Sequence, residues 1–192
     1  MKALHMTSLK QFQSINDSHI MTLRDVRTYN SQEDSCFTDL QEAKFDHYKV
    51  AVAIPTKRYE KEYAPQLRAL HESWGSDMSK YIFERDLWGE PHTVIKLDTK
   101  RVADWSTPKI WDTKLNLITE RLIIRMGSRL NVKINMRATE KNGTHFMQHQ
   151  VKEVQVLELS EGVESGPGFD VEDGFVYDNG GADLEVSSAA EF

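Results

Sequence analysis

The sequence predicts a mainly β protein, in which a small antiparallel barrel, closed or half-closed, carries one inserted helix. Three observations predict this fold: short stretches of alternating apolar and polar residues, one stretch with helical spacing, and an Asn-Gly dipeptide between strand-like segments. All three lie within residues 45–160, which we expect to form the domain. We expect residues 1–44 to form an N-terminal extension that contains one strand or short helix. We expect residues 161–192 to form a disordered acidic tail, because they are rich in glycine and lack apolar periodicity.

The first half of the domain is expected to contain a strand, a helix and a second strand. Residues 47–55 alternate and stop at a proline, which is typical of a β-strand. Pro65 suits the first position of a helix, and apolar residues then recur at spacings of three and four as far as Trp74. Gly75 is a suitable helix end. The apolar stretch 94–97 predicts another short strand.

The second half of the domain holds the clearest strand of the sequence. Residues 129–137 alternate without a break over nine positions. Asn142-Gly143 is the preferred dipeptide of a tight hairpin, and residues 144–150 are the return segment. The closing strand is expected at residues 151–159, where the alternation changes phase after Val156. This change of phase predicts a β-bulge or a corner of the barrel.

Charge is distributed unevenly along the chain. The net charge is −6, from 24 Lys and Arg against 30 Asp and Glu. Nine of these acidic residues and none of the basic ones lie in residues 161–192, so residues 1–160 carry a net charge of +3. Between Lys96 and Lys141 there are eleven basic and five acidic residues. A basic domain with an acidic tail is compatible with a nucleic-acid partner, although the total charge is negative.

Cysteine usage and hydropathy indicate the cellular compartment of the protein. Cys36 is the single cysteine, so no intrachain disulfide can form, which suits a reducing cytoplasm. Charged residues interrupt the first thirty positions repeatedly, which is unlike a secretory signal. The longest good apolar run, residues 50–54, is too short to span a bilayer. We therefore expect a cytoplasmic protein that has no membrane partner.

One face of the strand 129–137 is expected to be basic. Its members are Arg129, Asn131, Lys133, Asn135 and Arg137, which extend over about 27 Å at roughly 3.4 Å per residue. Such a row of cations and amides can follow a phosphate backbone. The alternative is an ordinary solvated strand face, although solvated faces usually mix charges of both signs and this one contains no acid.

Aromatic residues are interleaved with basic ones at several places in the domain. Bases of single-stranded nucleic acid stack on aromatic rings, while cations neutralise the phosphates. The alternative for each aromatic residue is a place in the core. The predicted DNA-binding residues are Lys57, Arg58, Tyr59, Lys100, Arg101, Trp105, Lys109, Trp111, Arg129, Lys133, Arg137, Lys141 and Phe146.

The last 32 residues combine acidic and aromatic side chains, and the sequence ends in phenylalanine. A charged peptide with an aromatic tip is suited to docking, because the ring can fill a pocket and a basic rim can receive the acids. The predicted partner-docking residues are Asp170, Glu172, Asp173, Glu185, Glu191 and Phe192. The alternative is a tail that only improves solubility.

Together these features resemble the bacteriophage single-stranded-DNA-binding proteins. The similarity rests on Arg125-Met126-Gly127-Ser128, on the strand Val-Gln-Val-Leu-Glu-Leu at 154–159, and on the acidic segment 169–175. It covers residues 125–192 well and residues 45–75 loosely, and the residues before Glu191 are less acidic than in that family.

The resemblance implies an OB-fold barrel that binds single-stranded DNA without strong sequence preference during phage replication, recombination and repair. It also implies an acidic tail that competes with DNA and docks a polymerase and a helicase or primase. The oligomeric state, including a homodimer, is left open.

Catalytic alternatives have little support in the sequence. It contains no Gly-rich phosphate loop, no HExxH and no CxxC pair. We therefore expect no enzymatic activity, no cofactor and no bound metal. Three further alternatives stay open: a strand-annealing protein, a virion or assembly protein, and a metal-dependent nuclease that uses Asp98, Asp104 and Asp112.

Overall fold

The computed structural model describes residues 9–29, 40, 46–103, 106–120, 122 and 124–160. Within them the elements are β1 (Ser18–Tyr29), β2 (His47–Pro55), α1 (Thr56–Glu62), α2 (Ala64–Trp74), η1 (Met78–Lys80), β3 (Ile82–Leu87), β4 (Glu90–Lys100), β5 (Lys109–Trp111), β6 (Arg129–Lys141) and β7 (Thr144–Glu158). The predicted tail, Trp105 and Cys36 lie outside the described residues.

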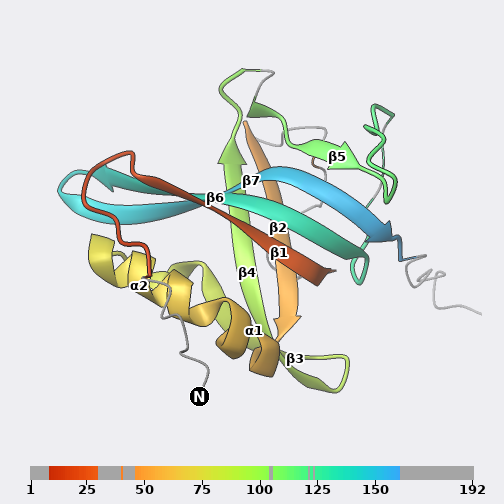
Figure 1. Cartoon of the computed structure of the whole chain (residues 1–192), viewed down its shortest axis with the longest axis horizontal. Helices are drawn as coiled ribbons and strands as arrows, with labels where there is room; N and C mark the ends of the chain where they lie inside the picture. Colours follow the sequence, from red (N-terminus) through yellow and green to blue (C-terminus); the bar gives the residue numbers. More distant parts are fainter. Residues whose placement is uncertain are drawn as a thin grey trace, which may run out of the picture. The chain divides into compact units, whose positions relative to one another are not determined.

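The described strands form one sheet in the order β3-β4-β2-β1-β6-β7-β5 (Figure 1). Neighbouring strands are antiparallel, except that β5 pairs in parallel with β7. The sheet curls so that β4 packs against β7, although the two are not neighbours in the strand order. Thr99 Oγ1 on β4 donates a buried hydrogen bond of 3.0 Å to the Val151 carbonyl on β7. The predicted mainly β barrel is therefore confirmed, with one parallel pairing added.

The core lies inside this curled sheet and under α2. The apolar faces predicted for the two clearest strands are buried as expected, and α2 covers them with its own apolar side. Each fully buried aliphatic side chain stabilises the fold by about 1.5–3 kcal/mol relative to exposure. The main contributors are Tyr48, Val50, Val52, Ile54, Leu67, Leu70, Trp74, Leu130, Val132, Ile134 and Met136.

The inserted helix is longer than predicted. α1 begins at Thr56, one residue separates it from α2, and Gly75 after α2 adopts a left-handed φ of 66°. Pro65 lies in the first turn of α2, as expected. The α1 segment escaped prediction because Tyr59 is its only buried residue, so a seven-residue helix shows almost no apolar periodicity. Among the described residues no helix is long and apolar enough to cross a membrane.

Residues 18–29, within the predicted N-terminal extension, form a central strand of the sheet. β1 lies between β2 and β6, and Leu23 and Val26 are fully buried. Its register against β6 shifts between these two residues. This bulge moves Val26 out of the two-residue alternation, which hides the strand from pattern analysis.

The long β6–β7 hairpin follows the prediction closely. Asn142 and Gly143 have φ values of 52° and 73°, which a tight hairpin turn of this kind requires. The register shifts where Arg129 pairs with Glu158 and the next residue pairs with Val156, which leaves Leu157 extra. The bulge predicted after Val156 is therefore confirmed. A second shift, near Lys152, increases the curvature of the same hairpin.

Candidate nucleic-acid interface

The outer face of β1, β6 and β7 carries the candidate interface. Because side chains alternate across a strand, the polar residues of β6 share this face with their partners on both neighbours. Asn131 pairs with Gln155, Lys133 with Glu153 and Thr22, and Arg137 with Gln148 and Ser18. The predicted row of cations and amides is therefore one line of a broader polar surface.

A groove of about 360 Å³ lies at the β5 end of this surface. It is lined by Thr22, Arg24, Trp111, Leu115, Asn131, Lys133, Glu153 and Gln155. The side chain of Asn131 donates to that of Gln155 at 2.8 Å, which fixes the amides along its floor. The groove brings together an aromatic ring and a cation, Trp111 and Lys133, that are predicted DNA-binding residues from separate parts of the sequence.

A tight loop after β5 presents an apolar side chain beside Trp111. The Asp112 carboxylate accepts hydrogen bonds from the backbone N–H groups of Lys114 and Asn116, at 2.8 Å each. These bonds and one from the Asn116 side chain lower the pKa of Asp112. Leu115 is held at a φ of 64° with 68% of its side chain exposed. A branched residue seldom adopts this backbone conformation, so the loop holds Leu115 there at some cost.

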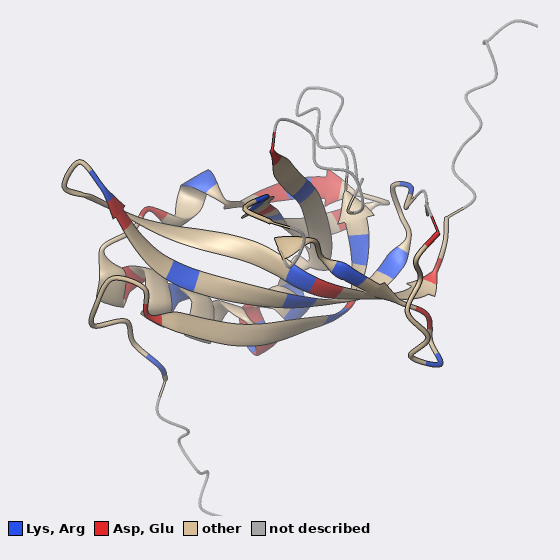
Figure 2. Cartoon of the chain, turned by 90° about the horizontal axis from the view of Figure 1, so that it is seen from above, with Lys and Arg blue, Asp and Glu red and all other residues tan. Residues whose placement is uncertain are grey.

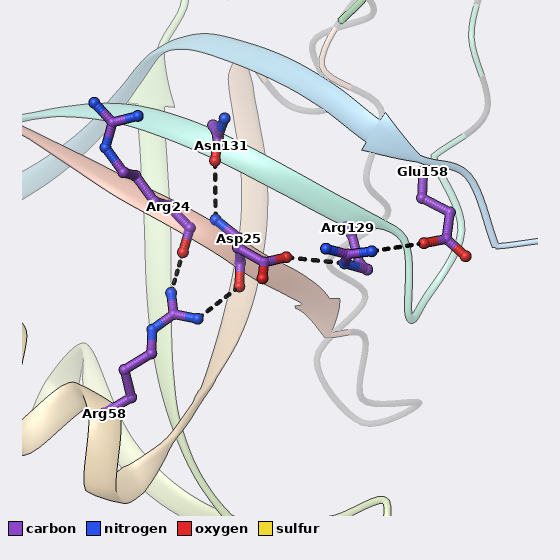
Figure 3. A network of polar contacts seen from close by, with 6 residues as sticks. All are labelled: Arg24, Asp25, Arg58, Arg129, Asn131 and Glu158. Carbon is purple, nitrogen blue, oxygen red and sulfur yellow. Dashed lines mark hydrogen bonds and ion pairs between the residues drawn. The ribbon is translucent and has the colours of Figure 1, made fainter.

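Acidic residues from β1 and β7 pair with the basic row of β6. Arg129 bonds to Asp25 at 2.9 Å and to Glu158 at 3.0 Å, as Figure 3 shows. Lys133 lies 3.3 Å from Glu153. The β6 sequence alone has no acid on this face, but β1 and β7 contribute acidic side chains to it once the sheet is assembled. Figure 2 shows basic and acidic positions side by side on the strands.

Comparison with known proteins shows where this fold occurs. No protein-family model matches the chain, and no curated protein sequence is similar to it. Among solved structures, gp2.5, a single-stranded DNA binding protein encoded by bacteriophage T7, matches with a TM-score of 0.57 at 20% identity. The match covers 84% of this chain and 100% of that one.

A second phage protein has the same architecture. The single-stranded DNA-binding protein from bacteriophage Enc34 matches with a TM-score of 0.53 at 13% identity, over 77% of this chain and 85% of that one. The structure of that protein in complex with single-stranded DNA matches with a TM-score of 0.52 at 12% identity. This match covers 81% of this chain and 98% of that one. The chain has the fold of the phage single-stranded-DNA-binding proteins. The fold that the sequence resemblance implied is thus confirmed.

The structure corrects the prediction for Tyr59. A ring that stacks on a base must be exposed, but only 2% of Tyr59 is exposed, within the core. Its hydroxyl is buried without a hydrogen-bond partner, and burial raises the pKa of this group to about 12. The alternation of Tyr59 with basic residues arises from a short amphipathic helix and not from a binding surface.

Arg58 has a role in holding the fold. Its guanidinium donates to the backbone carbonyls of Arg24 and Asp25, at the β1 bulge (Figure 3). It also forms an ion pair with Glu62 at 3.3 Å. These contacts satisfy carbonyl groups that the bulge removes from the sheet. Neighbouring Lys57 is exposed on α1 and has no carboxylate partner among the described residues.

The other predicted residues fall into three groups. Lys109 and Trp111 on β5 lie beside β7 at the groove. Lys141 and Phe146 lie at the turn end of the β6–β7 hairpin, where Lys80 Nζ is 5.5 Å from the centre of the Phe146 ring. Lys100 and Arg101 are exposed at the end of β4. Trp105, predicted beside them, lies outside the described residues.

Sequence reasoning missed a second group of cations and aromatic rings, on β1, β3 and the turn between β3 and β4. Arg27 lies 5.1 Å from the centre of the Trp88 ring, and Arg85 lies 4.8 Å from that of Phe83. Arg27 is far from the others in sequence, so no local pattern shows that it contacts Trp88. Because these cations already contact rings of the protein itself, the groove remains the better candidate for binding nucleic acid.

Proposed function

We propose that the protein is a non-catalytic, sequence-tolerant single-stranded-DNA-binding protein of the phage type, acting in DNA replication, recombination and repair in the host cytoplasm. The observation that carries the proposal is the groove in which Trp111 and Leu115 adjoin Lys133 and Arg24. Aromatic stacking and phosphate neutralisation are the two interactions that single strands offer irrespective of sequence. The shared fold with phage proteins described as binding single-stranded DNA supports the same conclusion.

The acidic partners in the interface fit such a function. The Lys133–Glu153 pair is exposed on both sides, and exposed ion pairs contribute only about 0–1 kcal/mol. A phosphate can therefore replace Glu153 at little cost. The carboxylates keep the surface from binding polyanions indiscriminately, while stacking in the groove favours strands whose bases are unpaired.

For the tail we propose a regulatory role. Its nine acidic residues complement the basic surface, and a coil of 32 residues spans about 30 Å, at roughly 5–6 Å × √n. The tail then competes with DNA for the groove. When DNA displaces it, Phe192 and the acidic residues before it become available to a replication polymerase or helicase–primase.

A fluorescence titration with oligo-dT across a salt series tests the binding function. If four to six phosphates are neutralised, the plot of log affinity against log salt should have a slope of roughly −3 to −4. Duplex DNA of the same length should bind much more weakly. A slope near zero, or equal affinity for duplex, would contradict the proposal.

A further inference from the structure

A second cavity, of about 340 Å³, opens at the seam where β4 packs against β7. Its walls come from β2, β4, β7, the end of η1 and the residue after η1. The buried side chains of Val50, Leu97 and His149 line it together with half-buried Tyr81. An apolar, partly aromatic lining of this size is typical of a site for a small organic group.

Basic residues surround this lining. Lys49, Lys80 and Lys96 contribute to its wall from β2, η1 and β4, and the one carboxylate there is Asp98. Asp98 is already bonded to His47, at 2.5 Å between Oδ1 and Nδ1. Lys49 and Lys80 have no carboxylate partner among the described residues. The rim therefore favours an anionic group, and the lining favours a flat apolar one.

His149 adds an uncharged ring to the lining. Its Nε2 lies 3.0 Å from Nε2 of His71, and its ring centre is 5.1 Å from that of Tyr81. Its Nδ1 is buried near the Lys96 backbone without a hydrogen bond of normal geometry. Burial and the neighbouring His71 lower the pKa of His149 to about 3, so the ring is neutral at physiological pH. Because only 2% of His149 is exposed, it forms part of the cavity wall, and the half-buried ring of Tyr81 is the one that can accept a base.

The cavity is continuous with the candidate interface through β7. Gln148 lines the cavity and pairs with Arg137 of the basic row. Phe146, two residues away, contacts Lys80 at the cavity rim. Along β7 about 17 Å separate Gln148 from Glu153 in the groove, at roughly 3.4 Å per residue. A strand that follows this face from the groove would therefore reach the cavity.

We propose that the seam cavity holds one nucleotide of a bound single strand, with its base against Tyr81 and its phosphate at Lys49 and Lys80. This inference rests on the proposed function and adds a second contact point, beyond the groove. It predicts that strands long enough to span both places bind more tightly than those that fill the groove alone, because the two contacts are then linked.

Titration and photocrosslinking of the full chain test the cavity. The double variant Lys49→Ala/Lys80→Ala should bind long oligo-dT about tenfold more weakly, with the salt slope reduced by about 0.7 because one phosphate is no longer neutralised. The control Lys10→Ala/Lys61→Ala removes two exposed lysines that line neither cavity and should bind like the wild type. Oligo-dT carrying 5-iodouracil should crosslink to Tyr81, as identified by mass spectrometry.

The outcomes separate the two proposals. If the wild type fails to bind oligo-dT, the proposed function is wrong. If the wild type binds, but the Lys49/Lys80 variant matches the control and Tyr81 is not crosslinked, only the cavity proposal is wrong. Circular dichroism of each variant, unchanged from the wild type, establishes that a loss of affinity does not come from unfolding.

Discussion

At the scale of single residues, Trp111 is the ring best placed to meet a base. It is half-exposed on β5 and shares the groove with Leu115 and Lys133. Trp111→Ala should weaken oligo-dT binding by about 1–3 kcal/mol, the range for one base stacked on an aromatic ring. Trp111→Phe should retain most of the affinity. Anisotropy titrations of a labelled oligonucleotide check both, and equal affinity of wild type and Trp111→Ala would remove this ring from the interface.

The three cations of β6 should not contribute equally, because their protein partners differ. Arg129 bonds to two carboxylates, Lys133 to one, and Arg137 to the Asn16 side chain at 2.5 Å. A basic side chain that carboxylates already neutralise compensates less phosphate charge, so fewer counterions leave the DNA when it binds. Arg137→Ala should therefore lower the salt slope most, by about 0.7, and Arg129→Ala least. The reverse order would show that the ion pairs open fully on binding.

Tyr59 and Leu115 show that sequence patterns do not determine whether a single side chain is exposed. Tyr59 lies among basic residues in sequence, but its helix directs the ring into the core. Leu115 looks unremarkable in sequence, and only the Asp112-centred loop places it, exposed, beside Trp111. The sequence shows where charged and aromatic residues occur close together. Whether a side chain is exposed depends on contacts with distant segments.

At the scale of elements, strands were predictable where the alternation is unbroken. β6 alternates over most of its length, so its buried face follows from sequence alone, whereas in β2 residues 50–54 are buried on both faces. β1 has a bulge at Arg24 and Asp25, and its central place in the sheet appears only through its pairing with β2 and β6. The acids that neutralise β6 were missed for the same reason, since cross-strand neighbours depend on register.

A buried histidine pair joins α2 to β7 and makes their packing sensitive to pH. The pKa of His149 falls to about 3, mainly through burial, while an unfolded histidine titrates near 6.5. Between these values the unfolded state binds more protons, so stability should fall as pH drops below 6.5, by about 1.4 kcal/mol per pH unit. Urea unfolding at pH 7.0 and 5.5 checks this. His149→Gln should reduce the difference and surface His47→Gln should not; if His149→Gln leaves it unchanged, other groups cause it.

At the scale of the whole chain, the acidic tail and the basic domain should act on each other. The charge balance of residues 1–160 is positive and that of residues 161–192 strongly negative, which opposes DNA binding wherever the tail can reach the groove. Tethering gives the tail a local concentration in the millimolar range. Deleting residues 161–192 should tighten oligo-dT binding at low salt, and the gain should fade as salt screens the attraction.

Removing only Phe192 separates competition from docking. The ring carries no charge, so its deletion should leave DNA affinity almost unchanged at every salt concentration. If the ring fills a pocket on a replication partner, the same deletion should abolish capture of a polymerase or helicase in a pull-down, and Phe192→Trp should restore it because an aromatic tip is retained. Two results would reduce the tail to a solubilising segment: weaker DNA binding after deletion of residues 161–192, and unchanged capture of every replication protein tested without Phe192.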